Sequence, residues 1–291
     1  MKSMPLADCM MRASDVVMHN GQQLTIVPQM RSMIRSAKRV QINELANDTW
    51  RAWNRGGSKK PHAESMRLRL PFDGIWFEWK VDQEAASEVF GSPLDMHDIG
   101  VLVSTTPIDE ISPGGQSSAV GAEHILTAEV FFKRQSGYSD VGILASVEMA
   151  VDDDGKWLQS KIVHMHGFTE DQMRRMYPIF MEPVVMAIAL MNCKNVFTES
   201  VPHQRTPKKS KPEKIPRLEF HTIKLPTPRG GGGSSASGDP TERAHHLVRG
   251  HFKTYTPDSP LMGHVTGTYW WGWQARGSKK NGIIKSDYIV A

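Results

Sequence analysis

Three runs of alternating apolar and polar residues, joined by turn residues, constrain the fold of this 291-residue chain more than any other feature. They occupy residues 124–134, 141–151 and 156–164. Asp154-Gly155 separates the last two runs, and an Asp-Gly pair between alternating runs is the strongest short-range signal of a β-hairpin. This region therefore predicts neighbouring antiparallel strands.

Helical periodicity appears on both sides of these strands. Apolar residues recur at helical spacing across residues 29–53, which predicts one or two amphipathic helices. Residues 169–191 predict another helix, which opens with a capping-box pattern at Thr169 and is interrupted or kinked at Pro178 and Pro183. Strands and helices together predict an α+β fold in which an antiparallel sheet packs against helices.

The composition of residues 229–240 (RGGGGSSASGDP) predicts a flexible Gly/Ser linker near the end of the chain. A Pro/Lys-rich segment with one predicted strand precedes this linker. We therefore expect three parts: an α+β body at 1–200, a basic segment with the linker at 201–240, and a small β-rich module at 241–291. The module is expected to contain three strands: residues 245–255, 267–275 and 283–290.

Several protein classes are excluded by residue types and motifs. Cys9 and Cys193 are too few for a disulfide framework or a Cys-rich zinc site, which favours a reducing compartment. No apolar run reaches the roughly 20 residues that span a bilayer, and the N-terminus lacks the apolar core of a signal peptide. The phosphate-loop, HExxH and GxSxG motifs are absent, so we predict no cofactor, no catalytic residue and no membrane contact.

Charge is distributed unevenly along the chain. Residues 1–200 contain 20 Lys/Arg and 25 Asp/Glu, whereas residues 201–291 contain 15 and 6. A basic tail on an acidic body is typical of proteins that contact nucleic acid or another polyanion. The tail therefore carries the candidate binding surface.

Strand alternation assigns two faces to residues 245–255, with Phe252 on the face expected to point to the core. The other face is basic and aromatic, which suits single-stranded nucleic acid, because cations neutralise phosphates and flat rings stack on bases. Basic residues after the next strand extend this pattern. The predicted nucleic-acid-binding residues are Arg249, His251, Lys253, Tyr255, Arg276, Lys279 and Lys280. Alternation also sends Trp270 and Trp271 to opposite faces, so at least one of the two belongs to the core.

A cluster of histidines raises the alternative of a metal site in the tail. Adjacent His245 and His246 point to opposite faces of a strand, so both cannot ligate one ion without a bulge. Acidic residues that would orient metal-bound imidazoles are few in this region. We therefore predict no metal site here, and none at the Asp152-Asp153-Asp154 run, where a tight turn cannot aim all three carboxylates at one ion.

The motifs resemble a family of uncharacterised tailed-phage and prophage proteins. The resemblance rests on four segments: LPFDGIW at 70–76, ALMNCKNV at 189–196, LEFH at 218–221, and the tail RGHFKTY…WWGWQARG…GIIKSDYIV. This chain has Lys253 where the family has an arginine, and Ser286 before the aspartate of the closing motif. The resemblance implies a phage-infected bacterial cell as the setting, and supplies no activity or catalytic residues.

The sequence favours a phage-encoded accessory protein without enzymatic activity, associated with RNA or single-stranded DNA through its basic module. An alternative is a protein-interaction factor, either an inhibitor of a host protein or a minor virion component, that docks an acidic host or phage partner. A weaker alternative is a nuclease with His251 as general base, although no nucleophile or orienting carboxylate can be placed beside it. The expected location is the host cytoplasm or the virion.

Overall fold

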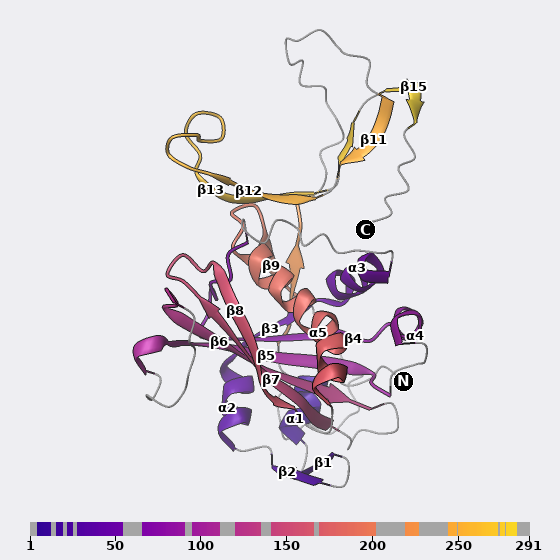
Figure 1. The fold of residues 1–291 in the computed structure, drawn as a ribbon, viewed down its shortest axis with the longest axis vertical. Coiled ribbons are helices and arrows are strands. Elements are labelled where there is room, and N and C mark those ends of the chain that lie inside the picture. Colours follow the sequence, from indigo (N-terminus) through magenta and orange to yellow (C-terminus); the bar gives the residue numbers. More distant parts are fainter. Residues whose placement is uncertain are drawn as a thin grey trace, which may run out of the picture.

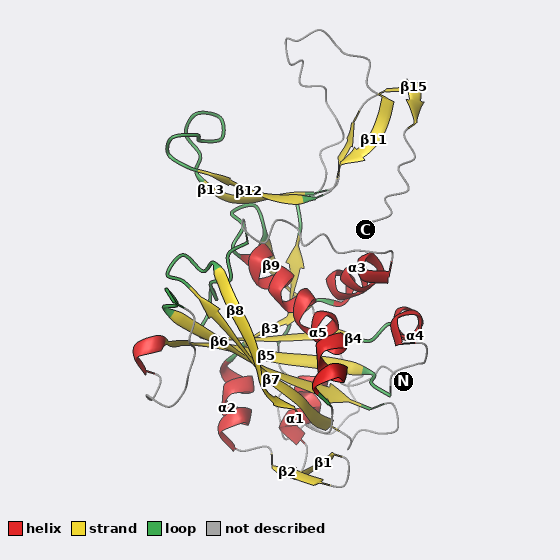
Figure 2. Cartoon of the chain, viewed as in Figure 1, coloured by secondary structure: helices red, strands yellow, loops and turns green. Residues whose placement is uncertain are grey.

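A computed structural model gives the architecture, in which one large mixed sheet carries helices on both of its faces (Figures 1 and 2). The fold is α+β, as predicted. The structure describes residues 5–12, 16–19, 22–25, 28–54, 66–90, 95–110, 120–134, 141–165, 169–201, 219–226, 244–248, 250–272, 274–276 and 278–283. The predicted Gly/Ser linker lies outside these residues.

The helices and strands divide into three groups. The helices are α1 (Leu6–Arg12), α2 (Pro28–Ser36), α3 (Asn43–Asn54), α4 (Gln83–Phe90), the short 3₁₀ helix η2 (Ile108–Glu110) and α5 (Glu170–Met191). The strands of the eight-stranded sheet, in spatial order, are β8 (Trp157–Met165), β7 (Val141–Val151), β6 (His124–Lys133), β5 (Asp98–Pro107), β4 (Gly74–Lys80), β3 (Lys38–Gln41), β10 (His221–Lys224) and β9 (Phe197–Ser200). The smaller sheets contain β1 (Val16–His19), β2 (Gln22–Thr25), β11 (Ala244–Val248), β12 (His251–Tyr255), β13 (Gly267–Trp271), β14 (Gln274–Arg276) and β15 (Ser278–Ile283).

Strands β4 to β8 form an antiparallel meander, which confirms the strand pairing expected from the three alternating runs. The β7–β8 turn closes through a hydrogen bond from the Gly155 amide to the Asp152 carbonyl, and Gly155 has a φ of 78°. Strand β3 pairs parallel to β4, β10 pairs parallel to β3, and β9 closes that edge antiparallel to β10. The sheet is therefore mixed, not purely antiparallel.

Residues from the two faces of β4 enter two different hydrophobic cores. Ile75, Phe77 and Trp79 pack in the core shared with α3, α4 and α5, whereas Trp76 belongs to the core under α1 and α2. This is the period-2 alternation of a strand that is covered on both faces. Figure 1 shows α5 crossing one face of the sheet while α1 and α2 lie on the other.

The interruption expected in the helix at 169–191 is not observed. Helix α5 is not interrupted at Pro178 or Pro183 but runs unbroken through 22 residues. Its long buried side, which includes Phe180, Val184 and Ile188, packs on the sheet, and this burial outweighs the roughly 3 kcal/mol that an internal proline costs. The stretch at 29–53 forms two helices, α2 and α3, which confirms one of the two predicted possibilities, and the short strand β3 between them pairs with β4 and β10.

The strands of the tail are also shorter than expected. The predicted strand at 245–255 is divided into β11 and β12, which belong to different sheets, and the strand at 267–275 is divided into β13 and β14. Gly250 stands between β11 and β12, where a Cβ atom would lie 2.5 Å from the Trp270 ring, so the backbone approaches that ring closely. Strand β15 ends at Ile283, and the rest of the expected strand at 283–290 lies outside the described residues.

Candidate functional site

Strands β12 and β13 form an antiparallel hairpin whose two faces differ in chemistry. Directly paired residues project from the same side of an antiparallel ladder. One side carries His251, Lys253 and Tyr255 from β12, opposite Trp271, Tyr269 and Gly267 from β13. We call this side the basic aromatic face. The other side carries Phe252, Thr254, Thr268 and Trp270.

The side opposite the basic aromatic face is anchored to the body of the protein. Phe252 is buried in the main hydrophobic core, and its ring centroid lies 4.8 Å from that of Trp270. Trp270 packs against the same core. The structure thus confirms that alternation places Phe252 on the core side, and it shows that Trp270 is the tryptophan that packs there.

A turn after helix α5 holds the hairpin by its edge. The Asn195 side chain donates a hydrogen bond from Nδ2 to the Trp270 carbonyl at 2.7 Å and accepts one at Oδ1 from the Trp270 amide at 2.9 Å. The neighbouring Lys194 amide donates to the Thr268 carbonyl at 3.0 Å. These three bonds imitate the pairing of a further strand, so β13 is attached to the body through its backbone.

The same turn brings a lysine to the basic aromatic face. A Cβ atom on Gly267 would lie 2.6 Å from Cε and 3.2 Å from Nζ of Lys194, so the lysine side chain lies against this glycine. Gly267 has a φ of 112°, a conformation that favours glycine. Lys194 is exposed and lies at the Gly267 end of the hairpin, although 59 residues separate it from Lys253 in sequence.

The aromatic residues of the face have unequal exposure. The Lys253 ammonium lies 4.7 Å from the centre of the Tyr255 ring, and Tyr269 meets the same ring edge-on at 5.9 Å. Tyr255 is only 8% exposed, so its ring supports these two neighbours and is poorly placed to stack on a base. Tyr269 and Trp271 are half-buried and offer the rings that a base could reach.

The other predicted binding residues are not part of this hairpin. Arg276 lies in β14, and Lys279 and Lys280 lie in β15, two strands that flank β11 in a separate three-stranded sheet. Arg249 lies outside the described residues. The structure therefore brings together His251, Lys253 and Tyr255 of the predicted set, and adds residues that alternation on one strand did not identify.

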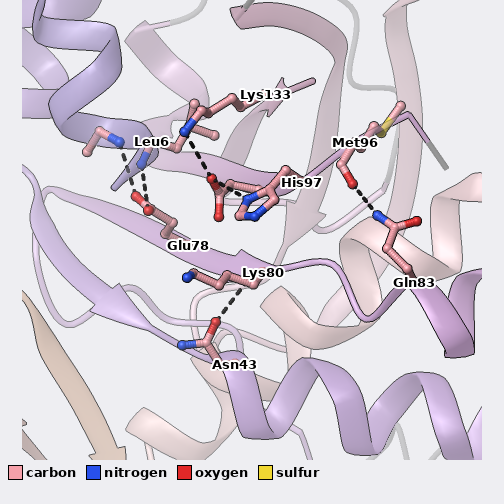
Figure 3. Close-up of polar contacts among 10 residues, drawn as sticks. Leu6, Asn43, Glu78, Lys80, Gln83, Met96, His97 and Lys133 are labelled. Atoms are coloured by element: carbon pink, nitrogen blue, oxygen red, sulfur yellow. Dashed lines mark hydrogen bonds and ion pairs between the residues drawn. The ribbon is translucent and has the colours of Figure 1, made fainter. Parts of the chain in front are cut away.

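A second group of polar residues, missed by sequence reasoning, lies buried between α1 and the sheet (Figure 3). The Glu78 carboxylate accepts hydrogen bonds from the amides of Leu6 at 2.6 Å and Ala7 at 3.1 Å, and from the Trp76 indole at 2.9 Å. It thus satisfies amides at the start of α1, which have no partner within the helix. No local pattern could reveal this, because Glu78 is 72 residues from Leu6.

Burial controls the protonation of this group. It raises the pKa of Glu78 to about 7, although the hydrogen bonds from Trp76, Ala7 and Leu6 oppose this shift. The nearby Asp98 carboxylate lies 3.5 Å from Lys133 Nζ, and both side chains are buried. The cluster is enclosed by α1 and the sheet, so we interpret it as a structural feature that seats α1.

The two cysteines are poor nucleophiles. Burial raises the pKa of Cys9 to about 11 and that of Cys193 to about 12, so both thiols stay protonated and weakly nucleophilic at neutral pH. Across the described residues, no group of three His, Cys, Asp or Glu side chains is placed to hold a metal ion. Within the same part of the chain, no helix has the length and apolar character needed to cross a membrane.

Comparison with known protein families, curated proteins and solved structures finds no match for this chain. The family resemblance of the tail motifs therefore stays a prediction.

Proposed function

We propose that this protein is a non-enzymatic, phage-encoded accessory protein that binds single-stranded RNA or DNA on the basic aromatic face of its β12–β13 hairpin. The observation that supports this best is the position of Lys253 directly opposite the half-buried Tyr269, with the half-buried Trp271 on the same side of the hairpin and the exposed Lys194 against Gly267 at its end. Proteins that bind single strands combine cations with accessible rings: the cations contact the phosphates, and the bases stack on the rings.

The anchoring of the hairpin supports the same proposal. Phe252 and Trp270 are held in the core on one side, so the basic aromatic face has a defined direction and needs little ordering when a ligand binds. The surplus of Lys/Arg over Asp/Glu in residues 201–291, 15 against 6, adds a general attraction for polyanions. The face then supplies the short-range contacts.

Fluorescence anisotropy with the full-length protein and a labelled oligonucleotide of about 12 nucleotides tests this proposal, since single-strand sites span roughly 4–16 nucleotides. Affinity is measured between about 50 and 200 mM salt, and a negative slope of log K against log salt is expected. Lys194→Gln and Lys253→Gln should each make that slope shallower by about 0.7, the contribution of one phosphate contact on a single strand. Lys80→Gln, an exposed lysine on β4, is the matched control and should leave the slope unchanged.

A ring substitution separates stacking from charge. Tyr269→Leu keeps apolar bulk but removes the flat ring, so it should weaken binding by about 1–3 kcal/mol without changing the salt slope. Absence of binding to RNA and DNA at low salt would refute the proposed function. If the protein binds a protein partner after nuclease treatment, and substitution of Lys194 and Lys253 abolishes this binding, the result would instead favour docking on an acidic protein.

A further inference from the structure

The segment that joins β12 to β13, residues 256–266, is a short structured projection, which we call the finger. It starts directly after Tyr255 and ends directly before Gly267, the paired residues that close the basic aromatic face. Isolated bridges join Thr256 to Ser259 and Leu261 to Val265. The second bridge consists of two hydrogen bonds: the Leu261 amide donates to the Val265 carbonyl at 2.7 Å, and the Val265 amide donates to the Leu261 carbonyl at 3.0 Å.

The tip of the finger is a tight turn with an unusual residue in it. Met262 has a φ of 52° and Gly263 a φ of 79°, and positive φ at both central positions is the pattern of a type I′ turn. Such turns favour Asn-Gly, because residues with larger side chains rarely adopt the left-handed conformation. Met262 is the sole non-glycine residue with a positive φ in the described part of the chain.

The Met262 side chain is not buried within the finger, so packing there does not compensate for its unfavourable backbone conformation. Met262 is 80% exposed, whereas its backbone is held by a contact of 2.8 Å between its carbonyl and His264 Nδ1. A 3.3 Å hydrogen bond from the His264 amide to the Leu261 carbonyl closes the turn. Backbone strain of this kind is concentrated at functional sites, which makes the exposed Met262 the candidate contact residue of the finger.

We infer that Met262 is a wedge that inserts between adjacent bases of a single strand bound on the basic aromatic face. This inference rests on the proposed function. Methionine is among the apolar side chains that proteins insert between base steps, and its thioether packs well against aromatic rings. The finger leaves the hairpin at the end of the face where Lys194 lies against Gly267, so a strand held by the lysines would continue towards it.

The ionisable residues of the finger support a base contact and not a further phosphate contact. Residues 256–266 contain no lysine or arginine, and their one acid is Asp258. Cations that hold phosphates therefore lie on the hairpin and the turn after α5, and the finger adds an apolar tip. A division of this kind matches single-strand recognition, in which charge holds the backbone and apolar or aromatic side chains contact the bases.

The experiment uses full-length protein and an oligonucleotide that contains 2-aminopurine, whose emission rises when it is unstacked from a neighbouring base. Wild-type protein should raise the emission on binding. Met262→Asn suits the type I′ turn, so it should keep or raise the melting temperature while lowering the affinity about tenfold, the equivalent of one lost stacking contact. The emission increase should also be lost in this variant. Met262→Leu keeps an apolar wedge and should retain both signals, as should Met33→Gln, which alters an exposed methionine on α2.

The outcomes separate this inference from the function on which it rests. If the wild-type protein binds no oligonucleotide, both are overturned. If it binds but Met262→Asn has the same affinity and the same emission increase, the wedge alone is overturned. Unchanged oligonucleotide binding in Met262→Asn, together with the loss of a protein partner, would assign the tip to a protein pocket and would equally overturn the wedge.

Discussion

Replacing Glu78 with glutamine should change how the stability of the protein depends on pH. The pKa of Glu78 is raised from its ordinary value of 4.5 to about 7 in the folded protein, chiefly because the carboxyl is buried. Folding therefore favours the protonated form. Well below pH 4.5 the group is protonated in both the folded and the unfolded protein, so it does not change the free energy of unfolding with pH. As the pH rises from 4.5 to about 7, the unfolded protein loses this proton first and the free energy of unfolding falls. Above that range the loss is complete.

The size of the effect follows from the shift. A change of one pKa unit corresponds to about 1.36 kcal/mol, so Glu78 should lower the stability of the wild-type protein by about 3 kcal/mol between pH 4.5 and pH 8. Glutamine does not ionise, so the variant should lack this pH-dependent component.

Denaturant unfolding of wild type and Glu78→Gln, measured side by side from pH 5 to pH 8, gives this difference. The glutamine NH2 group faces one of the N–H donors that the carboxylate accepts, so the variant should be less stable by an amount that does not depend on pH. On top of this offset, the variant should gain about 2.5 kcal/mol relative to wild type between pH 5 and pH 8. Glu84→Gln, an exposed glutamate on α4, is the control and should track wild type throughout. Parallel curves for Glu78→Gln and wild type would refute the reasoning, since the carboxyl would then have an unperturbed pKa.

Two further substitutions test how the hairpin and the sheet are held. Asn195→Ala removes both hydrogen bonds to Trp270 and should cost about 1–3 kcal/mol, seen as faster amide exchange in β13 but not in β6. Gly100→Ala places a Cβ 2.2 Å from the Trp76 ring and should destabilise the sheet by about 1–3 kcal/mol, read from the urea midpoint. Unchanged exchange in the first case, or an unchanged midpoint in the second, would contradict the packing described.

Part of the candidate site could be predicted from the sequence because its signals are local. Alternation along β12 separated Phe252 from His251 and Lys253, and the structure places Phe252 in the core as expected. The same local rule anticipated the hairpin at Asp154-Gly155 and the strands on either side of it. Turn chemistry and side-chain alternation act over two to four residues, so a single sequence is enough to reveal them.

Other parts of the site depend on segments far apart in the chain. Asn195 forms hydrogen bonds with Trp270, which is 75 residues away in sequence. The neighbouring Lys194 lies against Gly267. The family resemblance singles out the segment at 189–196 but supplies no role for it, and neither charge nor periodicity distinguishes these side chains from ordinary surface residues. Their role exists only because the core positions α5 and the hairpin next to each other.

The sequence by itself determined the fold class, the antiparallel strands around residues 124–165, the basic character of the tail and the core side of β12. Only the tertiary structure decided the parallel pairing of β3, the unbroken path of α5 through its prolines, the seating of α1 on Glu78 and the composition of the basic aromatic face. The physical reason is the range of the forces. Local conformational preferences are encoded residue by residue, whereas these other features arise from burial and pairing summed over the whole chain.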